Sequence, residues 1–369
     1  MERIAALIPA AGFSSRMGLY KPLLPLSPST LVIERAVNTF LEAGISDLKV
    51  IVGHKVELLS PVLERLGVEI VLNKDYEEGM YSSVRVGVQS LTEKTEAFFF
   101  LPADYPLVSN KTIEQIAREY NRGSCEIIYP VYQGQRGHPP LISKTVIPSI
   151  LESDGQGGLR RVLQESVNAE LEVPVDDKGI LIDLDYETDY KKIIQGFGLP
   201  GYPTRPECEE LWQKEGLADQ IIAHSLEVAR VAGIIGELLN SKGYYLHLGL
   251  IMAASLLHDI KKGEKNHAQK GKERLAELGF PEVASIIETH MDLPPEYQKR
   301  INEHSIVYLA DKMVQGCHVV SLKDRLASQR NRFGNNTLAL KEAKRRLDTA
   351  GEIQKRIEST LGFDLGEAL

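Results

Sequence analysis

The first apolar run of this 369-residue sequence is followed by small residues and then by two cations. Residues 7–26 read LIPAAGFSSRMGLYKPLLPL and contain Ala10, Ala11, Gly12, Ser14, Arg16 and Lys21. Backbone amides in such a turn can close around an anion, because no bulky side chain blocks the approach. Arg grips phosphate oxygens with a forked guanidinium and Lys adds a compact charge, so the segment suits a triphosphate whose pyrophosphate must leave. Taken alone, the turn could equally be a tight strand-to-helix connection.

A carboxylate follows a later apolar run, FFFLPAD, which ends at Asp104. This position corresponds to the carboxyl edge of a parallel strand, where open α/β sheets bind ligands. Mg²⁺ prefers oxygen ligands and keeps several waters, so one or two carboxylates at strand ends, such as Asp104, suffice to hold it against phosphates. The alternative is helix capping, by Asp104 for a helix that begins near Asn110 and by Asp183 or Asp185 for a helix over 187–194.

A second set of residues with chemical potential forms the series H...HD...D in the C-terminal half. Its members are His224, the adjacent His258 and Asp259, and Asp311, each within a helix of strong apolar periodicity. A polar residue in such a stripe needs a partner, which metal coordination supplies. Imidazole and carboxylate ligands suit Mn²⁺, Fe²⁺, Zn²⁺ or Mg²⁺ and leave room for water, which then becomes a nucleophile near neutral pH. The alternative is unrelated buried histidines and salt bridges.

Two more histidines and two lysines lie near this series. His267 could cap its helix, and both His267 and His290 could contact substrate or support the first ligands. Lys261 and Lys262 follow the His-Asp pair and are candidates for phosphate contact, with a solvated helix end as the alternative.

The elements that must position the first set alternate between strands and helices up to about residue 195. The predicted strands are Ile4–Ile8, Val50–Val52, Ile70–Leu72, Phe98–Leu101 and Ile127–Val131, and the predicted helices include Leu31–Ala43 and Ser82–Leu91. Strands that are apolar on both faces predict a mostly parallel sheet covered by helices on each side.

The second half has a different character. Residues 196–206 read GFGLPGYPTRP, which predicts a linker over 198–206 between a domain over 1–197 and another over 207–369. The second domain is predicted to be all-α, with helices at Asp219–Leu239, His247–His258, Ala268–Leu278 and Ser305–Val314. Beyond residue 330 we expect a polar loop and a long amphipathic helix with a structural packing role.

Composition excludes some classes of partner and leaves small phosphorylated ligands possible. The formal charge of -8 argues against nucleic-acid or anionic-membrane partners, which demand a clustered basic surface. Three scattered cysteines without CxxC spacing favour the reducing cytoplasm. The longest apolar run, Leu248–Leu257, is too short to cross a bilayer. We therefore expect a cytoplasmic protein with two domains.

The spacing AAGxSxRMGxxKxLLPL resembles the signature of the MobA/MocA-like nucleotidyltransferases. The similarity continues in order through NKDYEEGMYSSVRVGV (73–88), LPADYPLV (101–108), GQRGHPPLIS (134–143) and LIDLDYETDY (181–190). The resemblance implies a Rossmann-like nucleotidyltransferase fold. The implied nucleotide-binding residues are Ala10, Ala11, Gly12, Ser14, Arg16, Lys21, Gly79 and Ser83.

The same resemblance implies the remaining roles. Arg16, Lys21 and Asp104 would be catalytic, with Mg²⁺ held by Asp104 and a second carboxylate, Asp185 or Asp183. Residues 134–143 resemble an acceptor-side loop, in which Gly137 and His138 would face the acceptor.

Substrate choice rests on short segments. In this family the turn Ala10-Ala11-Gly12 points towards CTP. Pro9 resembles the start of sugar-nucleotide transferases and keeps a sugar- or polyol-phosphate acceptor open, whereas the GHP segment at 137–139 favours molybdopterin. The predicted reaction is therefore a cytidylyl transfer from CTP to molybdopterin that releases pyrophosphate.

The H...HD...D series, within about residues 203–330, resembles the HD superfamily of metal-dependent phosphohydrolases. The resemblance implies that His224, His258, Asp259 and Asp311 are metal ligands, with His267 and His290 at the positions of ligands for a second metal. We expect hydrolysis of a phosphate ester, with a nucleotide-sensing regulatory module as the alternative.

Overall fold

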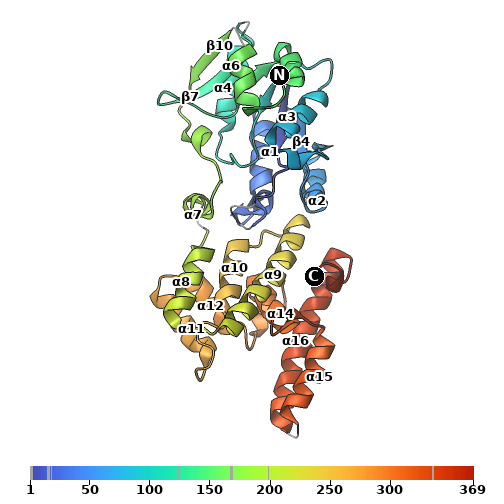
Figure 1. Ribbon diagram of the computed structural model, residues 1–369, viewed down its shortest axis with the longest axis vertical. Coiled ribbons are helices and arrows are strands. Elements are labelled where there is room, and N and C mark those ends of the chain that lie inside the picture. Colours follow the sequence, from blue (N-terminus) through green and yellow to red (C-terminus); the bar gives the residue numbers. More distant parts are fainter. Residues whose placement is uncertain are drawn as a thin grey trace. The chain divides into compact units, whose positions relative to one another are not determined.

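The computed structural model describes residues 3–14, 17, 19–123, 125–166, 169–197, 199–334 and 336–369. Contacts within the chain form two compact units, residues 1–190 and 191–369 (Figure 1). The division falls inside helix α7 (Glu187–Gly196), earlier than the predicted boundary at 197. The reason is local: Tyr190 is buried and its hydroxyl donates to Pro25 O at 2.6 Å, whereas Lys191 pairs with Glu207 at 2.9 Å.

The first unit contains an eight-stranded sheet in the order β10-β7-β9-β6-β1-β4-β5, with β8 paired to β7. Its strands are β1 (Ile4–Pro9), β4 (Asp47–Val52), β5 (Glu69–Leu72), β6 (Ala97–Phe100), β7 (Ile127–Tyr132), β8 (Gln135–Arg136), β9 (Leu141–Ser143) and β10 (Glu170–Pro174). A separate pair is formed by β2 (Pro25–Ser27) and β3 (Thr30–Leu31). Strands β5, β4, β1 and β6 are parallel, as are β7 and β10.

The prediction of a mostly parallel sheet is confirmed, with one insertion. Strand β9 runs antiparallel to both β6 and β7. Sequence analysis placed Leu141–Ser143 in an acceptor-side loop, and that part of the prediction is wrong. All three residues are buried between two neighbouring strands, so their backbone groups must pair with those strands.

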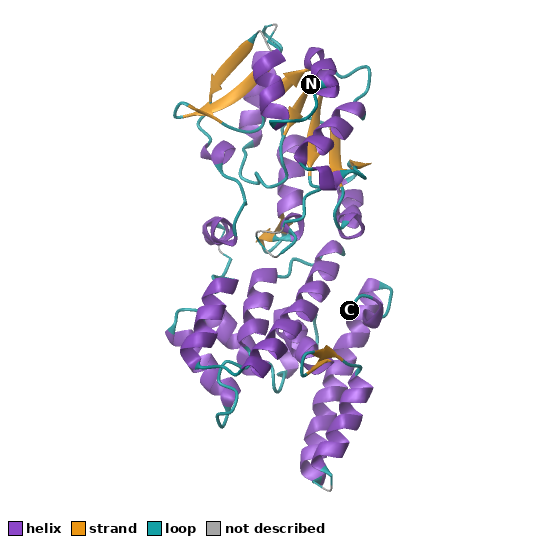
Figure 2. Cartoon of the chain, viewed as in Figure 1, coloured by secondary structure: helices purple, strands orange, loops and turns teal. Residues whose placement is uncertain are grey.

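Helices cover both faces of the sheet, as Figure 2 shows. They are α1 (Val32–Glu42), α2 (Val56–Leu66), α3 (Met80–Gln89), α4 (Asn110–Tyr120), α5 (Ile147–Glu152) and α6 (Gly158–Ser166). Successive side chains of a strand point to opposite faces. Accordingly Phe98 belongs to the core cluster that contains Val84 of α3, whereas the ring of Phe99 lies 5.6 Å from that of Phe40 in α1. Apolar packing on both faces fixes the strand ends that carry the candidate site.

Among its described residues, the regular structure of the second unit is helical apart from one hairpin of two short strands, β11 (Val314–Gln315) and β12 (His318–Val319). Its helices are α8 (Arg205–Glu215), α9 (Asp219–Ser241), α10 (Leu248–Leu257), α11 (His267–Glu277), α12 (Pro281–Thr289), α13 (Pro295–Gln298), α14 (Glu303–Met313), α15 (Leu322–Phe333) and α16 (Thr337–Leu361). Fully buried Val228, Ile251 and Leu309 lie in α9, α10 and α14, which contact one another.

The C-terminal segment differs from its prediction. Helix α15 continues to Phe333, so the polar loop expected from residue 331 is restricted to the few residues before α16. The polar residues at this end of α15 are mostly exposed, which a solvent-facing helix tolerates as well as a loop does. Helices α15 and α16 lie side by side (Figure 1).

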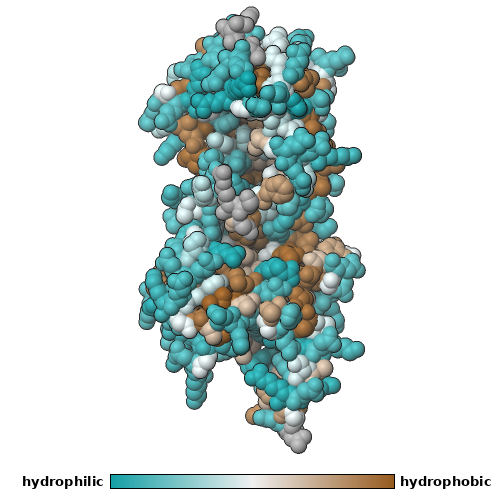
Figure 3. Space-filling view, viewed as in Figure 1, coloured by the Kyte–Doolittle hydropathy of each residue, from teal (hydrophilic) through white to brown (hydrophobic). Residues whose placement is uncertain are grey.

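The surface differs in polarity from the apolar interior. Hydrophilic side chains dominate the face shown in Figure 3, with smaller hydrophobic areas between them. Among the described residues, no helix combines the length and the apolar composition needed to span a bilayer.

Candidate functional sites

The loop after β1 forms one wall of a cavity of about 260 Å³. The loop is tied to the neighbouring strand, since the Ala10 amide donates to Ile51 O at 2.8 Å and the His54 amide donates to Ala11 O at 3.3 Å. No described atom lies within 4 Å of the position that a Cβ on Gly12 would take. The cavity side of Gly12 is therefore open, as an anion-binding loop requires.

Ser14 turns the end of this loop towards Lys21. Its φ of +53° lies in the left-handed region that non-glycine residues rarely adopt. Its hydroxyl accepts a hydrogen bond from the Lys21 amide at 3.2 Å, which orients the start of the turn Lys21–Leu23. Arg16, predicted to bind phosphate, lies outside the described residues.

Lys21 lies between two carboxylates at the rim of the cavity. Its Nζ is 3.6 Å from Asp104 Oδ2 and 3.2 Å from Asp185 Oδ1. The other oxygen of Asp104, Oδ1, is buried and has no hydrogen-bond partner among the described residues. Burial raises the pKa of Asp104, and Lys21 opposes that shift. A divalent cation would satisfy this oxygen and favour the ionised carboxylate, so the donors fit Mg²⁺.

The helix-capping alternative for Asp104 is wrong. Helix α4 is capped by Ser109, whose hydroxyl accepts from the Lys111 amide at 3.3 Å. Asp177 Oδ2 in turn accepts from the Ser109 amide at 2.8 Å. Asp104 therefore has no role at this helix end and belongs to the cavity instead.

The predicted nucleoside-side residues, Gly79 and Ser83, line the same cavity. Gly79 has a φ of +98°, and α3 begins at the next residue. Sequence analysis missed the aromatic side chains of this wall. Phe13 and Tyr76 both line the cavity, with ring centroids 5.3 Å apart, and Phe13 is exposed. In the sequence, only the aromatic nature of Phe13 and Tyr76 indicated this role, because flat apolar rings suit a nucleobase.

The two predicted acceptor-side residues are not among those that line this cavity. Gly137 packs tightly, since a Cβ there would come within 2.5 Å of Ile180 O. His138 is half-buried, and its ring centroid lies 4.5 Å from that of Tyr105. Burial lowers the pKa of His138, so its imidazole is neutral at physiological pH. Close packing thus explains why position 137 is a glycine. An acceptor role for Gly137 or His138 stays a prediction.

In the second unit, three helices bring the H...HD...D series together. His224 lies in α9, His258 and Asp259 directly follow α10, and Asp311 lies in α14. His224 Nε2 is 3.2 Å from Asp311 Oδ1, and His258 Nε2 is 3.5 Å from Asp259 Oδ2 and 3.7 Å from Asp311 Oδ1. The ligand atoms of His224, His258 and Asp259 lie within 4.8 Å of one another. This spacing allows one ion to contact all of them.

Backbone carbonyls hold the outward nitrogen of both imidazoles of this series and of the neighbouring His290. The bonds are His224 Nδ1 to Gly316 O (2.8 Å), His258 Nδ1 to Ser255 O (2.8 Å) and His290 Nδ1 to Ile287 O (2.6 Å). A carbonyl only accepts, so Nδ1 carries the hydrogen and a neutral ring presents the Nε2 lone pair to the cluster. His258 Nε2 is buried without a hydrogen-bond partner among the described residues, so the donors fit a metal ion.

The candidate residues for a second metal form an adjoining group. Asp259 Oδ1 is 3.2 Å from His267 Nε2 and 3.5 Å from His290 Nε2, and the two imidazole nitrogens are 3.3 Å apart. The capping alternative for His267 is wrong, because α11 begins at His267 after Asn266 and its N-terminus has no side-chain cap. Burial alone would raise the pKa of Asp259, but the surrounding imidazoles lower it well below its usual range. Asp259 thus belongs to both groups.

The two lysines after the His-Asp pair have different ion-pair partners. Lys262 Nζ lies 2.8 Å from Asp259 Oδ2, whereas Lys261 pairs with Glu215 at 2.6 Å and leaves the cluster. Sequence analysis missed Lys312, which is buried with Nζ 2.6 Å from Asp311 Oδ2 and donates to His290 O at 2.7 Å. Its position next to Asp311 at the end of an apolar run was the available signal.

Comparison with known proteins agrees with the two predicted domain types. Residues 6–171 match the MobA-like NTP transferase domain family, and residues 221–315 match the HD domain family. Residues 6–171 are therefore a MobA-like NTP transferase domain, and residues 221–315, C-terminal to it, are an HD domain. The chain is an enzyme with a nucleotidyltransferase domain.

Individual relatives cover the first unit. The molybdenum cofactor cytidylyltransferase of Escherichia coli is 27% identical over 191 residues, 52% of this chain and 95% of that protein. An uncharacterized protein of Methanocaldococcus jannaschii, MJ0778, is 30% identical over 34% of this chain and 83% of its own length. Rv0371c of Mycobacterium tuberculosis has a similar crystal structure, with 25% identity, coverage of 53% of this chain and 98% of that one, and a TM-score of 0.48.

Proposed function

We propose that the first unit transfers the cytidylyl group of CTP to molybdopterin in the cytoplasm, with Mg²⁺ as cofactor and pyrophosphate as the second product. The observation that carries the proposal is that the loop over residues 9–14, Lys21 and Asp104 line one cavity. The turn Ala10-Ala11-Gly12 supports CTP through its family resemblance. The similarity to the Escherichia coli cytidylyltransferase supports molybdopterin as the acceptor.

The proposed transfer needs the chain mainly to position its reactants. An acceptor phosphate oxygen forms a bond to the α-phosphorus of CTP while the bond to pyrophosphate breaks. The backbone amides of the loop and the Lys21 ammonium hold the phosphate tail and offset the charge of the departing pyrophosphate. Asp104 and Asp185, or Asp183 in place of Asp185, would hold Mg²⁺, which supplies charge neutralisation when bound. Phe13 and Tyr76 offer aromatic surface to the nucleobase.

We further propose that the HD unit is a metal-dependent phosphohydrolase. His224, His258, Asp259 and Asp311 would hold an ion of Mn²⁺, Fe²⁺, Zn²⁺ or Mg²⁺, and Asp259, His267 and His290 a second one. A bound ion there supplies a water nucleophile of lowered pKa. The residues themselves orient the ligand atoms of the site, because the carbonyl contacts of the imidazoles fix which ring nitrogen faces inward.

A panel of CTP, GTP, ATP and UTP with molybdopterin and Mg²⁺ tests the transferase proposal through pyrophosphate release. We expect CTP to be used, and a sugar phosphate or polyol phosphate to compete poorly with molybdopterin. Equal rates with GTP would remove the basis for CTP, and preferred turnover of a sugar phosphate would identify the other acceptor class. Phosphate release from p-nitrophenyl phosphate with each of the four metals tests the HD half. Tight nucleotide binding without phosphate release would indicate a sensing module instead.

A further inference from the structure

The HD metal cluster opens into a cavity of about 700 Å³. His224, Asp259, Lys262 and Asp311 line one side of it, and residues of α15 and α16 line the other. The HD family match ends at residue 315, so this second wall lies outside the matched region. Sequence analysis assigned the long C-terminal helix a packing role, yet the helix pair also encloses the metal cluster.

One face of α15 presents polar side chains to the cavity. Arg325, Gln329 and Arg332 all line it, and their spacing of i, i+4 and i+7 places them on the same side of a helix. Seven residues of α-helix rise about 10 Å. The row is therefore longer than a single phosphate group and matches a substrate with an extended organic part.

The arginines of this row differ from the other cations of the cavity in their ion-pair partners. Lys262 and Lys312 pair with the metal-ligand carboxylates, and Arg346 forms two bonds to Asp292, at 2.9 and 2.7 Å. In the part of the chain that the structure describes, neither Arg325 nor Arg332 forms an ion pair with a carboxylate. Divalent ions would offset Asp259 and Asp311, which leaves the α15 wall positive. Such a wall attracts an anion.

The two ends of the row are chemically distinct. Arg325 donates to Val314 O, on the strand that follows the metal ligand Asp311, so it lies at the metal end. At the other end the Arg332 guanidinium lies 5.8 Å from the ring centroid of Phe333, which also lines the cavity. A planar cation and an aromatic ring together form a surface on which a nucleobase can stack.

We propose that α15 is the substrate-binding wall of the HD site and that the substrate is a nucleoside phosphate. This inference rests on the proposed phosphohydrolase function of the HD unit. The phosphate binds at the metal cluster beside Arg325, and the base binds at Arg332 and Phe333. In the reaction, a water oxygen bonds to phosphorus, the ester P–O bond breaks, and a proton from the water ends on the nucleoside oxygen. The products are inorganic phosphate and a nucleoside.

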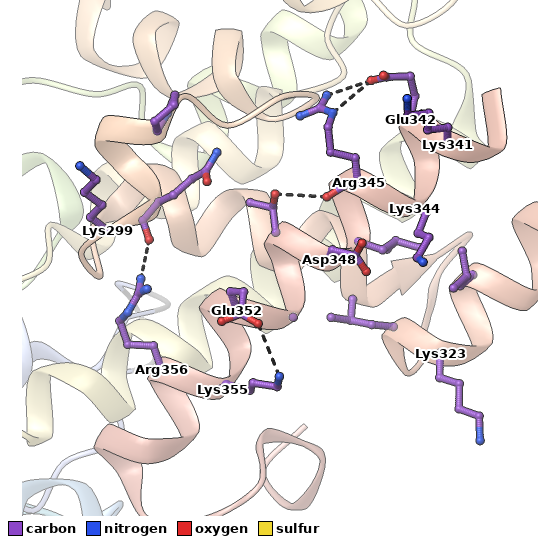
Figure 4. A pocket seen from close by; sticks show the side chains of 17 residues that line it. Lys299, Lys323, Lys341, Glu342, Lys344, Arg345, Asp348, Glu352, Lys355 and Arg356 are labelled. Carbon is purple, nitrogen blue, oxygen red and sulfur yellow. Dashed lines mark hydrogen bonds and ion pairs between the residues drawn. The ribbon is translucent and has the colours of Figure 1, made fainter. Parts of the chain in front are cut away.

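A neighbouring groove does not carry the same inference. It lies on another side of α15 and α16, has a volume of about 1030 Å³, and is rich in Lys and Arg (Figure 4). Its cations are interspersed with acids, as in the pairs Arg345–Glu342 at 3.0 Å and Lys355–Glu352 at 3.5 Å. It contains no metal-ligand residue among the described residues that line it. Its Lys323 on α15 therefore serves as a control.

The test measures phosphate release from CMP, GMP and glycerol 3-phosphate by the full chain with Mn²⁺. Glycerol 3-phosphate has the phosphate but no base, so we expect its KM to be at least about 10-fold higher than that of CMP or GMP. Arg332→Ala and Phe333→Ala should each raise the nucleotide KM about 10-fold, with kcat and glycerol 3-phosphate turnover unchanged. Arg325→Ala should raise KM for all three substrates. Arg330→Ala, an exposed arginine of α15 outside the cavity, and Lys323→Ala should change nothing.

Two results would overturn the inference while the hydrolase stands. One is equal KM values for glycerol 3-phosphate and both nucleotides, and the other is an unchanged nucleotide KM in Arg332→Ala and Phe333→Ala. If the chain hydrolyses none of these substrates or p-nitrophenyl phosphate with any of the four metals, the hydrolase proposal fails instead. Calorimetric titration of CMP, in a Lys21→Ala background that weakens the transferase site, then decides the inference. Weaker binding in Arg332→Ala supports the wall, and unchanged binding refutes it.

Discussion

The two candidate sites hold their functional groups in opposite ways. In the α/β unit, loops at strand ends create an open cavity, and one buried oxygen of Asp104 lacks a partner. In the helical unit, imidazoles and carboxylates project from packed helices and crowd together, with the outward nitrogens fixed by carbonyls. The first site is shaped by backbone and suits an anionic ligand, whereas the second is shaped by buried charge and suits a cation.

The largest expected effect is a double dissociation of the two activities. Asp104→Asn removes the carboxylate charge at the transferase cavity and should lower pyrophosphate release about 10³-fold, with phosphate release unchanged. Asp311→Asn should have the reverse effect. Both assays are run on the same preparations, with the exposed Asp176→Asn as the matched control. Loss of both activities in either variant would contradict independent sites.

Metal removal should affect the stability of the helical unit more than that of the α/β unit. A metal at 100 times its Kd stabilises the folded state by about 2.7 kcal/mol, or about 5–10 °C in the melting temperature of a unit of this size. Differential scanning calorimetry with Mn²⁺ and with a chelator measures the shift. Asp311→Asn should abolish the response, and the exposed Asp348→Asn should retain it. A shift confined to the α/β transition would refute the assignment.

Acid should weaken the helical unit through its buried histidines. Burial lowers the pKa of His247 to about 4, and the unfolded chain has a pKa of about 6.5, so the unfolded state binds more protons between these values. Stability should therefore fall as pH falls below about 6.5, by about 2 kcal/mol for His247 between pH 7.5 and 5. His247→Asn, which keeps an acceptor for the Leu250 amide, should flatten the profile in urea unfolding. The exposed His318→Asn should leave the slope as it is, and an unchanged slope in His247→Asn would exclude this cause.

The smallest expected effect tests the shape of the phosphate loop. Gly12→Ala adds a methyl group where no described atom lies within 4 Å, so the fold should tolerate it. If a phosphate occupies that space, KM for CTP should rise about 10-fold with an unchanged melting temperature. Gly123→Ala, also without neighbours within 4 Å and outside the cavity, is the control. An unchanged KM would mean that the phosphates bind elsewhere.

Local patterns predicted the elements well, because a helix or strand is encoded by neighbours within a few residues. The apolar period of α9 and α14, the run that forms β6 and the small residues after β1 all lie within one element or turn. The sequence also predicted the H...HD...D series as a site, since each of its polar residues interrupts an apolar stripe and so requires a partner. These local patterns indicated both domain types.

Contacts between distant segments decided the rest. The antiparallel insertion of β9, the burial of Lys312 beside Asp311 and the row of Arg325, Gln329 and Arg332 along the HD cavity depend on segments that meet only in the folded chain. Residues 322–333 carry no local sign that some of them line the cavity beside the H...HD...D residues, because an exposed helix face and a cavity-facing one have the same polar composition. Sequence thus determined which residues could do chemistry, and tertiary packing determined which of them share a cavity.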